Sequence, residues 1–347
     1  MEVVEKDKYV GDIITNDSKH TKNVMTRRSK GMGVIGEIIC ILDGLTLGSH
    51  YFSTAMMMRQ SMLVQVLLSN SETWLRLTKN DLSKLESVDR MFFRRIFQVP
   101  NSTPLSFLYL ETGSVPLRFI MKMRRVMYLH HILTRREDAL ITRTFWAQVQ
   151  QPAKGDWCIV VREDLDAIGL GYLSYEDIRN MEEEALRMLL QIKVRETAFT
   201  KLMEDKQKCS KLSGLKYSYL EMQPYLSSLS NLTNKMKRVL FRWRSHTINV
   251  KKNMGVRDSK CPLCEKAEDT QYHLLTCPLL RVAQPWNIES VIHALREREI
   301  ILEQRNNDNV TDDKTVTVNK QGNKTTKTMP RTKQTKSKPI QVHQATK

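Results

Sequence analysis

Apolar residues recur at intervals of three and four positions through most of this 347-residue chain. One stripe runs Leu82, Leu85, Val88, Phe92 and Ile96, which is the spacing of an amphipathic α-helix. Thr78 precedes this stripe as a helix N-cap, with Asp81 three positions later. Similar patterns predict helices over about 20–42, 53–68, 116–136, 174–208, 233–246 and 289–304. The sequence therefore predicts a mainly α fold.

Two segments interrupt this pattern. Residues 150–172 are rich in Gln, Pro, Gly and Asp, which predicts a loop and a domain boundary. Residues 303–347 contain ten basic and four acidic residues and no aromatic residue. Their few apolar side chains cannot offset the entropy of ordering the chain, so we expect a disordered basic tail.

The formal net charge of +17 points to a polyanionic partner, most simply RNA or DNA. No apolar run approaches the roughly 18 residues of a membrane span, so no membrane partner is expected. The first 35 residues contain no apolar run typical of a secretory signal. We therefore expect an intracellular protein, in the nucleus or cytoplasm, that is not secreted.

Three of the six cysteines lie close together with a histidine between them. Cys261, Cys264, His273 and Cys277 have the spacing C-x2-C-x8-H-x3-C. Asp269 or Thr270 could cap a helix that places His273 and Cys277 one turn apart. Three thiolates and one imidazole form a closed tetrahedral set, which predicts a structural Zn²⁺ site rather than a catalytic one. The alternative is a chance cluster of unpaired cysteines.

Basic residues gather beside this motif and in one earlier helix. The helix over 233–246 is predicted to bury Met236, Val239, Leu240 and Trp243, and His130 and His131 are interpreted as structural. The predicted nucleic-acid contacts are Arg238, Arg242, Arg244, Lys251, Lys252, Arg257 and Lys260, with Lys122, Arg124 and Arg125. For any single residue, a solvated helix face is the competing interpretation.

Several short motifs follow one another between about residues 8 and 280. They are KYVGDII (8–14), RRSKGMG (27–33), NSETW (70–74), the stripe over 82–96, Thr103-Pro104, YLETG (109–113) with Pro116-Leu117, Arg124-Arg125 with Tyr128-Leu129, FRWR (241–244) and the Cys/His set. Their order resembles the C-terminal part of reverse transcriptases from non-LTR, LINE-type retrotransposons. In that family the Cys/His set is a terminal CCHC zinc knuckle.

The patterns and the resemblance together divide the chain. The expected parts are the end of the palm (1–18), a thumb-like helical domain (19–149), a linker loop (150–172), a helical linker domain (173–250), the zinc knuckle (251–285), a short helix (286–302) and the disordered basic tail (303–347).

The family's polymerase carboxylates, which hold two Mg²⁺ ions, lie upstream of the part that this chain resembles. No aromatic-x-Asp-Asp element occurs here, and the one adjacent Asp pair, Asp312-Asp313, falls in the predicted tail. The resemblance therefore implies a truncated copy with no polymerase activity and no catalytic residues. The missing fingers–palm portion of the parent enzyme would be its natural partner.

These expectations support an RNA- or RNA–DNA-binding fragment as the leading hypothesis. A zinc-dependent protein-interaction module is the second hypothesis, because an acidic protein partner would also suit the charge. A non-functional translated relic is the third, because helices with runs such as Met56–Met58 would lack their original packing partner.

Overall fold

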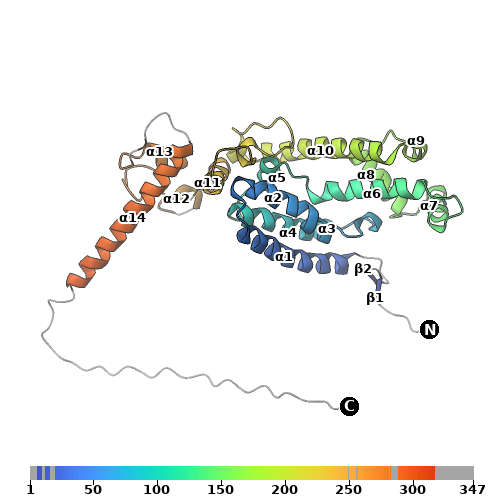
Figure 1. The fold of residues 1–347 in the computed structure, drawn as a ribbon, viewed down its shortest axis with the longest axis horizontal. Helices are drawn as coiled ribbons and strands as arrows, with labels where there is room; N and C mark the ends of the chain where they lie inside the picture. Colours follow the sequence, from blue (N-terminus) through green and yellow to red (C-terminus); the bar gives the residue numbers. More distant parts are fainter. Residues whose placement is uncertain are drawn as a thin grey trace, which may run out of the picture. The chain divides into compact units, whose positions relative to one another are not determined.

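The computed structural model describes residues 6–9, 12–15, 20–248, 250–254, 257–280, 282 and 288–316. It is mainly helical, as predicted (Figure 1). The longer helices are α1 (Thr21–Gly44), α4 (Lys79–Phe97), α6 (Leu117–Leu133), α7 (Leu140–Gln150), α8 (Trp157–Ala167), α10 (Glu183–Gln207), α11 (Asn234–Arg244) and α14 (Ile288–Val316). The shorter ones are α2 (Tyr51–Met58), α3 (Val64–Leu67), α5 (Leu105–Thr112), α9 (Tyr175–Asn180), α12 (Lys251–Met254) and α13 (Gln271–Thr276), with single turns at Gly48–His50, Ser71–Thr73, Ser210–Leu212 and Pro224–Leu226.

The run over 9–14 is strand-like in sequence and predicts one strand, whereas the described N-terminal residues form a hairpin. Strands β1 (Lys6–Tyr9) and β2 (Asp12–Thr15) pair antiparallel, and positions 10 and 11 lie outside the described residues. The Asn23 side chain in α1 accepts from the Ile13 backbone N–H (2.6 Å) and donates to the Ile13 carbonyl (3.0 Å). This reciprocal pair attaches the hairpin to α1.

Helix α1 packs along α4 and against α3 (Figure 1). A Cβ atom at Gly31 would lie 2.6 Å from Leu67 Cδ2, so the glycine permits the close approach of α1 and α3. Helix α4 contains the predicted apolar stripe over 82–96 and begins directly after the predicted cap, Thr78. Thr78 Oγ1 accepts from the Asp81 N–H (3.1 Å) at its start, and Gln98 closes it in the left-handed conformation (φ +53°).

The predicted helix over 53–68 forms as one helical run with an irregular centre. A π-helical turn, η2 (Arg59–Leu63), separates α2 from α3. Such a turn accommodates one residue more than an α-helical turn. It places Arg59 toward the interior, where its side chain is 3% exposed.

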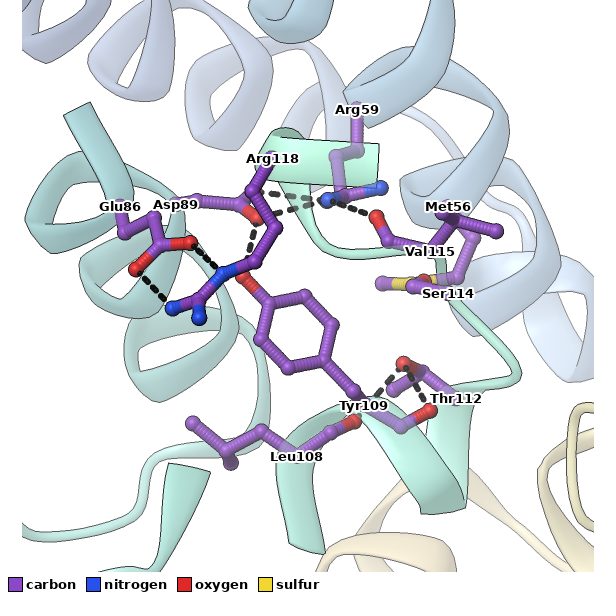
Figure 2. Close-up of polar contacts among 10 residues, drawn as sticks. All are labelled: Met56, Arg59, Glu86, Asp89, Leu108, Tyr109, Thr112, Ser114, Val115 and Arg118. Carbon is purple, nitrogen blue, oxygen red and sulfur yellow. Dashed lines mark hydrogen bonds and ion pairs between the residues drawn. The ribbon is translucent and has the colours of Figure 1, made fainter. Parts of the chain in front are cut away.

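A buried polar network centred on Arg59 and Asp89 joins four segments of the chain (Figure 2). Arg59 makes a two-pronged ion pair with Asp89, at 2.7 and 2.6 Å, and donates to the Val115 carbonyl (3.2 Å). The Tyr109 hydroxyl donates to the same carboxylate (2.7 Å). The network thus connects η2, α4, α5 and the segment that leads into α6.

The ion pair with Asp89 keeps Arg59 charged despite its burial. Burial disfavours the charged form of Arg59, but the attraction of Asp89 outweighs it and raises the pKa of the guanidinium. Burial and the Asp89 charge raise the pKa of Tyr109, so its hydroxyl keeps the proton that it donates. Beside it, Arg118 pairs with Glu86 through two bonds of 2.7 and 2.8 Å (Figure 2).

Helices α10 and α8 both pack against α6. The predicted loop over 150–172 is therefore wrong for Trp157–Ala167, which form α8. Val161 and Leu165 of α8 are fully buried. Pro152 and Gly155 lie shortly before the helix. Because such residues are typical of turns, the sequence predicted a loop for the whole segment.

The single helix predicted over 174–208 is divided in two. Ser174 and Asp177, three positions apart, form a capping box at the start of α9, but this helix ends at Asn180. Met181 and Glu182 have extended backbone (ψ 138° and 140°) before α10 begins. The acidic first turn of α10 shows that the Glu182–Glu184 run begins a second helix, where it complements the helix dipole.

Helix α11 buries a different face from the predicted one. Its buried residues are Lys237 and Phe241, because the Lys237 ammonium reaches backbone carbonyls at Ser49 (3.1 Å) and Ser227 (2.8 Å). The Phe241 ring stacks on Phe97, with centroids 4.0 Å apart. The residues expected in the core are only half-buried: Met236, Val239, Leu240 and Trp243.

The chain divides into two units, Met1–Arg296 and Glu297–Lys347. Helix α14 continues through Val316, so residues 303–316 are helical where a disordered tail was expected, and they include Asp312-Asp313. Residues 317–347 of the predicted tail lie outside the described residues.

Asp89→Asn should strongly destabilise the protein, because it leaves the Arg59 guanidinium buried without an anion. Removing one partner of a buried ion pair costs about 3–5 kcal/mol, measurable here as the free energy of urea unfolding. The control Asp138→Asn removes the partner of Arg136 in an exposed pair (side chains 67% and 86% exposed). It should cost less than about 1 kcal/mol. Equal losses in the two variants would contradict the assignment.

Candidate metal centre

Cys261 and Cys264 lie in a tight turn. The Cys261 N–H donates to the Ala267 carbonyl (2.8 Å), and the Glu265 N–H donates back to the Cys261 carbonyl (2.9 Å). Glu265 has left-handed backbone (φ +56°), so the chain reverses directly after Cys264. This local folding directs both sulfurs to the same side of the turn.

The other two residues of the motif lie on the short helix α13. Of the two predicted caps, Thr270 is the one used, and its Oγ1 accepts from the His273 N–H (3.0 Å). The helix ends at Thr276, and Cys277 is its C-terminal flanking residue with extended backbone (ψ 124°). His273 and Cys277 are therefore one turn apart, as the spacing predicted.

The four side chains converge on one point. Their ligand atoms all lie within 4.8 Å of one another. The Cys261 and Cys277 sulfurs are 3.9 Å apart, and the Cys264 sulfur is 3.3 Å from His273 Nε2. Cys261 and Cys277 are buried, and the other two are half-buried. This arrangement can hold a metal ion.

The thiols differ in their tendency to ionise. Burial opposes ionisation of Cys264, but hydrogen bonds from the Lys266 backbone and from His273 lower its pKa from 9.0 to about 7. Burial raises the pKa of Cys277 to about 11, and the negative charges of Cys261 and Cys264 add to the effect. Three thiolates in so small a volume repel one another, so a cation between them would stabilise all three.

Two polar residues beside the ligands connect them to the neighbouring helices. Asp269 is fully buried, and its Oδ2 accepts from the Lys251 N–H (2.7 Å) at the start of α12. The Gln271 side chain donates to the Trp243 carbonyl (3.2 Å) near the end of α11. The folded turn and α13 are therefore coupled to the basic segment that precedes them.

The predicted nucleic-acid residues on α6 serve internal contacts. Asp164 of α8 pairs with both Lys122 and Arg125, each at 2.6 Å. Arg125 is buried, whereas Arg124 donates to the Leu68 carbonyl and to the Gln65 side chain. In this geometry these cations hold α8 and the end of α3 against α6.

The three predicted arginines on α11 also have internal partners. Arg238 donates to the Ile96 carbonyl (3.2 Å) and Arg242 to the Gln98 carbonyl (2.9 Å), both at the C-terminal end of α4. Arg244 makes an ion pair with Glu111, with Nη2 2.8 Å from the carboxylate. These three arginines, which the sequence predicted to contact nucleic acid, therefore attach α11 to α4 and α5. We call these contacts the α11 clamp.

The predicted residues nearest the Cys/His set are more accessible. Lys251 pairs with Asp258 (3.6 Å) and Lys252 with Glu268 (2.9 Å). Arg257 and Lys260 are both exposed, and neither forms an ion pair within the described residues. Within the described residues, no hydrogen bond or ion pair joins these four residues to Lys122, Arg124 or Arg125.

One buried acceptor was missed by sequence reasoning. Glu111 is fully buried, and the Tyr217 and Tyr225 hydroxyls donate to it alongside Arg244. The available signal was a lone carboxylate in the otherwise apolar segment of α5, which requires a polar partner when buried.

Comparison with protein families, with curated proteins and with solved structures finds no match to this chain. Among the described helices, none is both long and apolar enough to cross a membrane.

Asp269→Ala should loosen α12 without removing the four ligand residues. The variant loses a charge-assisted hydrogen bond to the Lys251 amide, which is typically worth about 1.5–3 kcal/mol. We expect that amide to exchange with deuterium about ten-fold faster, with unchanged metal content. The control Glu268→Gln alters an exposed neighbour and should leave the exchange rate as it is. Unchanged exchange in Asp269→Ala would show that α12 does not depend on this bond.

Proposed function

We propose that this chain is a zinc-stabilised nucleic-acid-binding fragment related to non-LTR retrotransposon reverse transcriptases. The observation that carries the proposal is the convergence of Cys261, Cys264, His273 and Cys277 at a spacing that resembles that family's terminal knuckle. RNA, alone or paired with DNA, is the proposed ligand.

Zinc is the metal that fits the donor set best. Tetrahedral Zn²⁺ with Zn–S bonds near 2.3 Å requires sulfurs about 3.8 Å apart, and Cys261 and Cys277 are 3.9 Å apart. Four protein ligands would complete the tetrahedron, which favours a structural ion over a catalytic one. Bound Zn²⁺ would neutralise the thiolates and fix the turn against α13.

Unpaired surface charge supports a polyanionic ligand. The chain has a net charge of +17. In the first half of α1, Lys22, Arg28 and Lys30 are exposed and form no ion pair within the described residues. Arg257 beside the knuckle is similarly exposed. Such cations attract phosphate at long range and release counterions when they bind it.

We further propose that the chain binds nucleic acid without polymerising it. Polymerisation needs carboxylates that hold two Mg²⁺ ions. The sequence has no aromatic-x-Asp-Asp element, and Asp312-Asp313 is its one adjacent Asp pair. Any polymerase chemistry would require carboxylates from outside these 347 residues, such as those of a fingers–palm portion.

A zinc-dependent protein-interaction module is the second candidate. It is favoured by exposed apolar residues on α10, where Met188 (54% exposed) and Ile192 (55%) lie one turn apart. An interaction module would bind RNA weakly or only at low salt.

The purified chain should contain one zinc ion, measured by elemental analysis and by release to a colorimetric chelator. Cys264→Ser should lower the zinc content, because it removes one of four ligands. Cys40→Ser is the matched control, since Cys40 is an exposed thiol outside the set. Full zinc retention in Cys264→Ser, or loss in Cys40→Ser, would refute the ligand assignment.

RNA binding can be tested by fluorescence anisotropy with a structured RNA, a single-stranded DNA and a DNA duplex at several salt concentrations. Each phosphate contact should steepen the salt dependence of log K by about 0.7–0.9. We expect tight, salt-sensitive RNA binding that Cys264→Ser weakens and Cys40→Ser does not. Absence of binding to all three ligands would refute the proposed function and favour the interaction module.

A further inference from the structure

Four arginines surround the C-terminal end of α4. Arg90 and Arg94 lie one turn apart on α4 itself, and Arg238 and Arg242 approach from α11. We call these four residues the arginine cluster. Three of them bind backbone carbonyls at one helix end: Arg94 binds Asn101 (2.6 Å), Arg238 binds Ile96 (3.2 Å) and Arg242 binds Gln98 (2.9 Å).

These contacts leave the positive charge of the cluster largely uncompensated. A helix C-terminus offers the equivalent of about half a negative charge, against four guanidinium groups. None of the four forms an ion pair with a carboxylate within the described residues. One exposed carboxylate, Asp43, helps to raise the pKa of the Tyr51 hydroxyl. The Arg238 guanidinium lies over the Tyr51 ring, 5.0 Å from its centroid.

The arginines also act on one another. Burial lowers the pKa of Arg94, and the charge of Arg90 adds to this effect. Burial and the Arg238 charge do the same for Arg242. In addition, Arg94 Nε is buried without an acceptor among the described residues. An external anion would reduce the repulsion between like charges held together in this way.

We propose that the arginine cluster binds consecutive phosphate groups of an RNA strand. Carbonyl bonds occupy one or two of the five N–H donors of a guanidinium, so the remaining donors can bind phosphate in its preferred two-pronged geometry. The same carbonyl bonds, and the stacking of Arg238 on Tyr51, hold the groups in place before the ligand arrives. A phosphate that draws Arg94 outward would also give its Nε an acceptor.

This inference rests on the proposed function but places the main phosphate contacts away from the zinc knuckle. The test variant is Arg90→Gln/Arg94→Gln, because neither residue belongs to the α11 clamp. Its matched control is Arg136→Gln/Arg179→Gln, which removes the same charge from two exposed arginines that are paired with Asp138 and Glu137. Thermal melting checks that each variant folds. If the double variant does not fold, Arg90→Gln alone replaces it, because Arg90 forms no hydrogen bond or ion pair within the described residues.

Anisotropy titration with single-stranded RNA should show about a ten-fold weaker Kd for the double variant near 0.15 M salt. Its salt slope should be shallower by about 1.5, for two lost phosphate contacts. Arg90→Lys/Arg94→Lys should bind more tightly than the glutamine variant but less tightly than the wild-type chain, because lysine keeps the charge but cannot make the two-pronged bond. If the wild-type chain binds RNA and the double variant behaves like the control, the cluster is not the site and the proposed function stands.

If the wild-type chain binds no RNA, the proposed function fails, and the assignment of the cluster to RNA fails with it. Polyglutamate provides the remaining distinction. Equal binding of polyglutamate and RNA by the wild-type chain, lost equally in the double variant, would overturn the RNA assignment in favour of an acidic protein partner.

Discussion

The buried ion pair between Arg59 and Asp89 joins η2 to α4 in the interior of the helical bundle. A charge in a protein interior is tolerated when its hydrogen-bonding groups are satisfied. Here Tyr109 and the Val115 carbonyl complete the shell around the pair. Because these partners come from η2, α4, α5 and the start of α6, the network fixes how those elements meet. Helix α4, which carries Asp89, also provides the carbonyls and the Phe97 ring that α11 contacts.

Local features of this protein were predictable, and distant pairings were not. Helix α4 could be predicted because its cap and apolar stripe lie within one segment, and the Cys/His set because its ligands lie close together in sequence. The partner of Arg59, which lies in the π-turn, is Asp89, thirty residues away in the sequence. Lys237 is buried because carbonyls from two other segments surround its ammonium, which no pattern within α11 reveals.

The basic composition of the chain has two separate uses. On α6 and α11, cations bind carboxylates and the carbonyl ends of helices, so part of the net charge stabilises the bundle. Other cations form no ion pair within the described residues, such as Lys22, Arg28 and Lys30 on α1 and Arg90 and Arg94 on α4. Sequence reasoning treated all of them as equivalent, because the partner of a long side chain is set by tertiary packing. The net charge of +17 therefore overstates the field available to a ligand.

The π-helical turn also explains the spacing of the buried residues in this helical run. The buried positions Ala55, Arg59, Leu63 and Leu67 follow one another at intervals of four. In a regular α-helix each such step would turn the stripe by about 40° past a full circle. The wider turn at η2 absorbs this drift, so α2 and α3 keep their buried faces aligned. A related chain could therefore lose one residue between positions 59 and 63 and regain a regular helix with the same flanking contacts. Alignments of such chains should place a single-residue gap there.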